Sequence, residues 1–282
     1  MDVAQIPSRT LGATGVHASV FGLGGEGVLC TFGYSASARD VIETALREGV
    51  TYFDSARAYA GSEQYYGATL GAARANVFLA SKAHDRSRAG AMVMLDQTLQ
   101  NMRTDHLDLW QLHDLRNWEE LDEICAPGGA YEAFVEAKRA GKTRFIGVTG
   151  HHDPAVLAAA VERLSFDMVL MPVNPCEPQG STFLTQVGAR AIERGMGVIG
   201  MKVLARGLLR RFDGAPTTQE LMDYALSQPI HAVIIGCSSV DQVHENAAAA
   251  RAFAPMPPER QRELERRLVP VAEQALYYRG VV

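Results

Sequence analysis

The fold is decided by residues 77–114, which read VFLASKAHDRSRAGAMVMLDQTLQNMRTDHLDLWQLHD. The two ends of this stretch, Val77–Ser81 and Leu107–His113, are short apolar runs typical of buried β-strands. Between them, Ala89–Met102 has the spacing of apolar residues that indicates a helix. Two strands joined by a helix predict a βαβ unit, in which the strands run parallel.

The same alternation continues in both directions along the chain. The further strands that we expect are Ser19–Gly22, Val50–Asp54, Thr143–Val148, Met168–Met171, Gly197–Met201 and Ala232–Gly236. The further helices are Ala38–Glu48, Glu63–Leu70, Gly129–Ala140, Pro154–Leu164, Phe183–Arg194, Thr218–Leu226 and Val240–Ala252. Eight strands, each followed by a helix, predict an α/β fold of the (β/α)8 TIM-barrel type. A doubly wound open sheet shares the local pattern and is the alternative, but the number and even spacing of the strands favour the barrel.

Two segments lie outside this repeat. Arg9–Val20 contains a glycine-rich turn between apolar residues, which predicts an N-terminal β-hairpin. Glu259–Leu276 follows the proline-rich break Pro255–Pro258 and predicts an extra C-terminal helix. Barrels of about 250 residues form single domains, and no linker interrupts the chain. We therefore expect residues 1–282 to form one domain.

The composition narrows the class of protein. The 282 residues are 47% hydrophobic and carry a net charge of −5, which argues against binding to nucleic acid or to a membrane surface. No segment approaches the ~18 apolar residues of a membrane span, and the first residues lack the pattern of a signal peptide. The four cysteines form no C-x-x-C pair, as expected for reduced thiols. We expect a cytoplasmic protein with a small-molecule partner; the oligomeric state is not indicated.

Four chemically active side chains follow three successive predicted strands. Asp54 ends one strand, Tyr59 lies in the next loop, and Lys82 and His113 follow the two strands of the opening stretch. In a barrel, the carboxyl ends of the strands form one face, where functional residues gather. A tyrosine titrates near pKa ~10, and a neighbouring Lys82 is expected to lower the pKa of Tyr59. The four residues therefore predict an acid–base site, in which Asp54 keeps Lys82 charged and in position.

Alternation along the strand supports this prediction. Leu109, Gln111 and His113 lie on one face of the strand, whereas Trp110 and Leu112 lie on the other. If the first face is turned toward the barrel axis, His113 points into the mouth of the barrel. Trp110 then packs beneath the surrounding helices.

Taken together, these motifs resemble the aldo-keto reductase superfamily. The segments that carry the resemblance are FDSARAYAGSEQYYGATL (53–70), SKA (81–83), LDQTLQNMRTDHLDLWQLHD (95–114) and GCSSVDQVHEN (236–246). The resemblance implies a reversible carbonyl–alcohol conversion with a nicotinamide cofactor and identifies Asp54, Tyr59, Lys82 and His113 as the catalytic tetrad. Tyr59 would act as general acid, and His113 would orient the carbonyl.

The resemblance also implies that the loops after the last four strands hold the cofactor. The positions that it identifies are Thr149, Gly150, Asn174, Met201, Lys202, Leu204, Arg206, Gly236, Ser238, Ser239, Gln242 and Asn246. Gly150 replaces the usual asparagine, and Met201 replaces the frequent ring-stacking tyrosine. In the segment after the last strand (236–246), the Lys and Arg with which the family usually binds the 2′-phosphate of NADPH are missing. We nevertheless expect NADP(H), with NAD(H) as the alternative.

Three further motifs require interpretation. Phe32, Tyr34 and Trp118 are the candidate substrate contacts for a small carbonyl or sugar-like molecule. Gly22–Gly27 fits G-x-G-x-x-G, but loop-like residues follow it, so we expect a structural turn instead of a dinucleotide fingerprint. His151-His152-Asp153 could suggest a metal site. Adjacent histidines on a loop usually face different directions and no other ligands accompany them, so we expect no metal.

These observations predict an NADPH-dependent reductase of aldehydes or ketones. One alternative keeps the fold and chemistry but acts in the oxidative direction as a sugar or polyol dehydrogenase. The other alternative is a non-enzymatic nicotinamide-binding regulatory subunit of the same fold.

Overall fold

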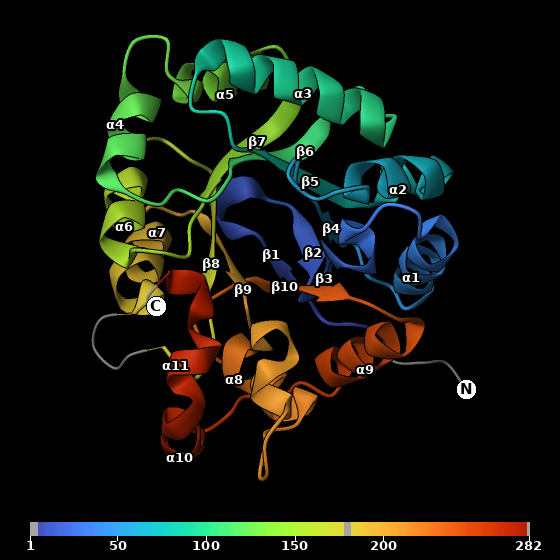
Figure 1. The fold of residues 1–282 in the computed structure, drawn as a ribbon, viewed down its shortest axis with the longest axis vertical. Helices are drawn as coiled ribbons and strands as arrows, with labels where there is room; N and C mark the ends of the chain where they lie inside the picture. The colour runs from blue at the N-terminus through green and yellow to red at the C-terminus, as the bar shows by residue number, and fades with distance from the viewer. Residues whose placement is uncertain (1–4, 178–181, 281–282) are drawn as a thin grey trace.

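A computed structural model describes residues 5–177 and 182–280. Its centre is a closed barrel of parallel strands in the order β10-β3-β4-β5-β6-β7-β8-β9 (Figure 1). The strands are β3 (Phe21–Gly27), β4 (Tyr52–Asp54), β5 (Phe78–Ala83), β6 (Leu107–Leu112), β7 (Thr143–Thr149), β8 (Met168–Pro172), β9 (Gly197–Met201) and β10 (Ala232–Cys237). The predicted TIM barrel is confirmed, and the open sheet is excluded because β10 pairs with both β3 and β9.

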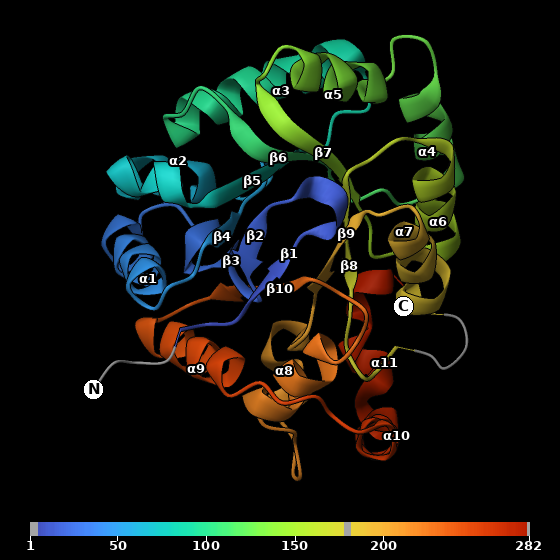
Figure 2. The same cartoon turned by 180° about the vertical axis from the view of Figure 1, so that it is seen from behind.

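Helices surround the barrel on its outer side (Figures 1 and 2). Seven match predicted helices: α1 (Ser35–Arg47), α2 (Ser62–Thr69), α3 (Arg88–Met102), α5 (Ala130–Arg139), α6 (Pro154–Arg163), α8 (Thr218–Leu226) and α9 (Val240–Arg251). The helix expected at Phe183–Arg194 is a π-helical turn, Leu184–Gly188, followed by α7 (Ala189–Glu193). The C-terminal helix is divided into α10 (Pro258–Leu268) and α11 (Ala272–Ala275).

The predicted hairpin covers one end of the barrel. Strand β1 (Ser8–Thr10) pairs with β2 (His17–Ser19) in antiparallel register, and Figure 2 shows the pair lying across the barrel. Leu11 and Ala18 belong to the apolar cluster inside the barrel. A Cβ atom on Gly12 would lie 2.4 Å from the backbone nitrogen of Gly197, so the turn rests on the first residue of β9. The hairpin therefore closes the amino-terminal end and leaves the carboxyl-terminal end for the site.

Two local predictions are wrong. The glycine-rich run was expected to be a turn after Ser19–Gly22, but it forms most of β3 itself. Its glycines allow close packing, because a Cβ atom on Gly24 would lie 3.2 Å from the backbone nitrogen of Gly236 on β10. Between the predicted strand Leu107–His113 and the predicted helix Gly129–Ala140, where no helix was predicted, the structure also contains α4 (Trp118–Cys125). Its signal was the side chain of Asn117, which accepts a hydrogen bond from the Glu120 N–H as an N-cap.

The core has two layers, as the alternation along Leu107–His113 predicts. Leu109 lies in the apolar cluster inside the barrel. Trp110 lies outside it, stacked on Phe134 of α5 with ring centroids 3.7 Å apart. The four cysteines are free thiols. No helix in the described part of the chain is both long and apolar enough to cross a membrane.

Candidate active site

A buried ion pair lies at the carboxyl ends of β4 and β5. The Nζ atom of Lys82 donates a hydrogen bond to Asp54 Oδ2 and a second, of 2.7 Å, to the carbonyl oxygen of Ser55. Gln111 on β6 donates from Nε2 to Asp54 Oδ1 at 3.1 Å. The side chains of Lys82 and Asp54 are only 2% and 3% exposed. Three strands thus fix the orientation of a charged pair in the barrel interior.

Tyr59 and His113 complete the predicted set of four. Their rings meet edge to face with centroids 5.6 Å apart. The Lys82 ammonium lies 5.1 Å from the centroid of the Tyr59 ring. The backbone N–H of His113 donates a hydrogen bond of 2.8 Å to the carbonyl oxygen of Ala83, which attaches the loop after β6 to the end of β5. The fold therefore brings the four predicted residues together at the mouth of the barrel.

The pKa of Tyr59 departs from the prediction. We expected the Lys82 ammonium to lower it, but burial of the phenol raises the pKa of Tyr59 well above its usual value. The carboxylates of Glu26 and Asp54 add to this rise. Tyr59 is therefore protonated throughout the neutral range, which suits a proton donor.

The pKa of His113 moves in the opposite direction. Burial of the imidazole, followed by the nearby Lys82 charge, lowers this pKa well below its usual value. His113 is therefore a neutral imidazole at neutral pH. A neutral ring can donate one hydrogen bond and accept another.

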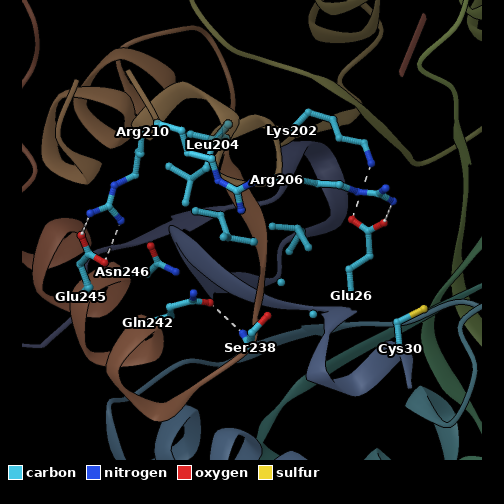
Figure 3. A pocket seen from close by; sticks show the side chains of 17 residues that line it. Glu26, Cys30, Lys202, Leu204, Arg206, Arg210, Ser238, Gln242, Glu245 and Asn246 are labelled. Carbon is cyan, nitrogen blue, oxygen red and sulfur yellow. Dashed lines mark hydrogen bonds and ion pairs between the residues drawn. The ribbon is translucent and has the colours of Figure 1, made fainter. Parts of the chain in front are cut away.

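A cavity of about 520 Å³ lies between the loops that follow β3, β9 and β10. None of the four predicted catalytic side chains lines it, but Glu26, which does, is close enough to Tyr59 to affect its pKa. Figure 3 shows that basic side chains from the loop after β9 reach into it and pair with two carboxylates. Arg206 donates to Glu26 at 2.7 Å, and Lys202 Nζ lies 3.6 Å from the same carboxylate. Arg210 forms two contacts with Glu245 of α9, of 3.0 and 2.9 Å. The lining contains four basic residues and two carboxylates, so its charge balance favours anionic ligands.

Seven of the predicted cofactor positions line this cavity: Lys202, Leu204, Arg206, Gly236, Ser238, Gln242 and Asn246. Ser239 is the N-cap of α9 and accepts a hydrogen bond from the Gln242 N–H. The residues Glu26, Cys30, Arg210 and Arg211 also line the cavity and were not predicted. No periodic pattern marks such loop residues, although the adjacent arginines were a weak signal of an anion site.

Five predicted cofactor positions lie outside the cavity lining: Ser239, described above, and Thr149, Gly150, Asn174 and Met201. Thr149 accepts a hydrogen bond from the Asp114 N–H at 2.9 Å, and Gly150 follows it at the end of β7. Met201 packs against the apolar cluster inside the barrel. The amide of Asn174 donates to the Tyr278 hydroxyl at 2.8 Å and to the Lys202 carbonyl at 3.4 Å. The donors of Asn174 are therefore already engaged by the protein.

The three predicted substrate contacts lie apart from the cavity. The exposed fractions of Phe32, Tyr34 and Trp118 are 67%, 54% and 43%. Trp118 belongs to α4, and its ring lies 5.6 Å from the guanidinium of Arg163 on α6. None of the three lines the cavity described above. Their roles in substrate binding remain predictions.

The two adjacent histidines do not face different directions, as we had expected. The rings of His151 and His152 stack with centroids 4.4 Å apart. Both turn toward Asp114, which directly follows His113. Asp153 instead caps α6 by accepting a hydrogen bond from the Ala155 N–H at 2.8 Å. The partner of the histidines therefore comes from the loop after β6, which their own sequence motif does not reveal.

Comparisons with known proteins agree with this geometry. The model of the aldo/keto reductase family matches residues 31–223. L-galactose dehydrogenase from Arabidopsis thaliana is 28% identical, over 88% of this chain and 89% of that protein. The aldo-keto reductase AKR11C1 from Bacillus halodurans, in its holo form, superposes with a TM-score of 0.79 at 24% identity, covering 93% of this chain and 96% of that one. An aldo-keto reductase from Klebsiella pneumoniae, solved in complex with NADPH, gives a TM-score of 0.74 at 19% identity, with coverage of 95% and 96%.

Proposed function

The chain belongs to the aldo/keto reductase family of NAD(P)H-dependent oxidoreductases, and we propose that it reduces aldehydes or ketones to alcohols with NADPH. The observation that carries this proposal is the tetrad Asp54, Tyr59, Lys82 and His113 at the barrel mouth, next to a cavity with basic walls. Reduction of a carbonyl requires a hydride for carbon and a proton for oxygen. The cavity can hold the cofactor that supplies the hydride, and the tetrad can supply the proton.

The chemistry of the cavity fits a dinucleotide phosphate. Lys202, Arg206, Arg210 and Arg211 offer positive charge to phosphate groups, and Ser238, Gln242 and Asn246 offer hydrogen bonds. Its volume of about 520 Å³ lies in the range of cofactor pockets. The NADPH bound by the Klebsiella pneumoniae relative supports the choice of cofactor. When bound, the cofactor supplies the hydride for the carbonyl carbon.

The side chains of the tetrad supply the proton chemistry. Tyr59 is protonated at neutral pH because of its raised pKa, so it can donate its proton to the carbonyl oxygen. The Lys82 ammonium, 5.1 Å from the Tyr59 ring, stabilises the negative charge that develops on the phenol. Asp54 holds Lys82 in place, and neutral His113 can orient the carbonyl by a hydrogen bond.

A panel of aldehydes, ketones and sugars tests this proposal. We expect the purified protein to oxidise NADPH, followed by its absorbance, in the presence of at least one carbonyl class. NADPH binding is measured separately by fluorescence. If NADPH binds but no carbonyl is reduced, the proposed reaction is wrong. If NADPH does not bind, the assignment of the cavity is wrong.

A sugar dehydrogenase working in the oxidative direction is the second candidate. It is favoured by the similarity to L-galactose dehydrogenase over most of both chains. The mouth also contains Glu26, His151 and Asp114, polar groups able to bind the hydroxyls of a sugar. Turnover of aldoses with NADP⁺ or NAD⁺ that exceeds turnover of all carbonyls with NADPH would support this direction.

Arg210 is expected to determine the preference for NADPH over NADH. Arg210 forms an ion pair with Glu245 and lines the same cavity as Asn246. There it can take the place of the Lys and Arg that usually bind the 2′-phosphate of NADPH and that this chain lacks in residues 236–246. Hydrogen bonds to charged groups contribute about 1.5–3 kcal/mol, so Arg210→Met should weaken NADPH binding by about 10- to 100-fold. NADH binding should hardly change, as measured by fluorescence titration. Arg260→Met on α10, which removes a surface pair with Glu263, is the control. Equal weakening of both cofactors would contradict this role.

Glu26 is expected to raise the pH at which alcohol oxidation begins. Oxidation needs the Tyr59 phenolate as base; burial is the main cause of the raised pKa of Tyr59, and the Glu26 carboxylate raises it further by disfavouring that anion. Glu26→Gln removes the negative charge, so the rise of kcat for oxidation should move to lower pH. Glu48→Gln, whose ion pair with Arg251 lies elsewhere, should leave the profile unchanged. A shift of the Glu26→Gln profile to higher pH would rule out this effect.

A further inference from the structure

A second cluster of chemically active side chains lies at the barrel mouth, outside the tetrad and the cavity. Asp114 follows β6, whereas His151 and His152 follow the neighbouring strand β7. His151 Nδ1 lies 3.1 Å from Asp114 Oδ1, and His152 Nε2 lies 3.2 Å from the same oxygen. The three ligand atoms all lie within 4.8 Å of one another. Two nitrogens and one oxygen are thus close enough together to share one ion.

Hydrogen bonding within the protein does not explain this convergence. Asp114 Oδ1 and His152 Nε2 are buried atoms without a hydrogen-bond partner among the described residues, despite their short separation. Buried polar atoms are almost always paired, and an unpaired one often marks a missing ion or water. A ring nitrogen without a hydrogen-bond partner has its lone pair available for a metal ion.

The surroundings hold these ligands in position. Arg116 donates to the other oxygen of Asp114 at 2.8 Å, which leaves Oδ1 directed at the histidines. The Asp114 N–H donates to Thr149 Oγ1 at 2.9 Å, which joins the two loops. The Tyr278 ring packs edge to face against His151 with centroids 6.1 Å apart. Metal ligands are commonly oriented by such outer contacts.

We propose that Asp114, His151 and His152 bind a divalent transition-metal ion, such as Zn²⁺, at the mouth of the barrel. Zn²⁺ lies about 2.0–2.2 Å from nitrogen and carboxylate ligands, which in a tetrahedral site places neighbouring ligands about 3.3–3.6 Å apart. The observed separations of 3.1 and 3.2 Å are slightly shorter, so a small outward movement of the side chains accommodates the ion. Imidazole nitrogen is a preferred ligand of zinc, cobalt, nickel and copper, but not of magnesium or calcium. Three protein ligands leave a coordination position for water.

The site is tested with full-length protein that carries no histidine tag and has been dialysed against a chelator. Zn²⁺ binding is measured by calorimetry, and Co²⁺ binding by its visible absorption. We expect one ion per chain and no response to Mg²⁺ or Ca²⁺. Failure of Zn²⁺ and Co²⁺ to bind the unaltered protein would overturn the proposal, whatever the enzyme's redox activity.

Single substitutions identify the ligands. Loss of an outer contact typically weakens a metal site by about 10–100-fold, so His151→Gln, His152→Gln and Asp114→Asn should each weaken binding by more than about 100-fold. Asparagine suits the Asp114 position because it tolerates the positive φ of 57° found there. His106→Gln is the control, since the His106 imidazole pairs with Asp105 and is not a member of the cluster. Circular dichroism confirms that each variant is folded. Binding that survives both histidine substitutions would contradict the assignment.

Discussion

Replacing Tyr59 by phenylalanine is expected to lower kcat for carbonyl reduction by about 10²- to 10⁴-fold, the usual contribution of a positioned general acid. The substitution removes one hydroxyl and leaves the ring in its contact with His113. The proton must then come from solvent instead of from a positioned side chain. Tyr59 is not among the residues that line the cavity, so NADPH affinity should remain nearly unchanged.

The chain offers a matched control for this experiment. Tyr65 lies on the following helix α2, and its hydroxyl donates to the carbonyl oxygen of Thr31 at 2.7 Å. Tyr65→Phe removes the same group from a site without a role in proton transfer, so kcat should stay within a few-fold of the unaltered enzyme. Turnover of Tyr59→Phe at the unaltered rate would show that another group supplies the proton. Loss of NADPH binding in this variant would show that the effect of Tyr59 is on the cavity instead.

The tetrad could be predicted because its members are tied to strand ends. Asp54, Lys82 and His113 each follow an apolar run that is visible in the sequence, and closure of the barrel brings such ends together. The inward direction of Gln111, which bonds to Asp54, also follows from alternation along β6. The regular geometry of the strands and the barrel therefore makes this part of the site predictable from the sequence.

The remaining features depend on contacts between loops, which have no periodic pattern. Glu26 lies near Tyr59 because β3, which contains Glu26, pairs with β4, and Tyr59 lies in the loop after β4. Its charge adds to the burial that reverses the expected shift in the pKa of Tyr59. Asp114 meets His151 because neighbouring strands β6 and β7 end side by side. In both cases the partners are distant in the sequence, so neither motif indicates the other.

Replacing Lys82 by methionine is expected to lower the free energy of unfolding by about 3–5 kcal/mol, because it leaves the buried Asp54 carboxylate without its partner. The loss should be smaller at acidic pH. Burial raises the pKa of Asp54 in the folded protein, and without the Lys82 charge this pKa rises further. Since the folded state then binds the proton more tightly than the unfolded state, protonation restores stability as the pH falls. Urea denaturation at acidic and neutral pH measures this difference.

A second substitution separates the structural role of the pair from its catalytic role. Asp54→Asn removes the unpaired charge while its carbonyl oxygen can still accept the hydrogen bond from Gln111. The Lys82→Met/Asp54→Asn double variant should therefore recover most of the lost stability, because a buried ion pair contributes little net stability over neutral residues of similar volume. Its carbonyl reduction should stay as low as that of Lys82→Met, since no ammonium remains beside Tyr59. If activity returned together with stability, Lys82 would serve the fold alone and the proposed stabilisation of the phenolate would be wrong.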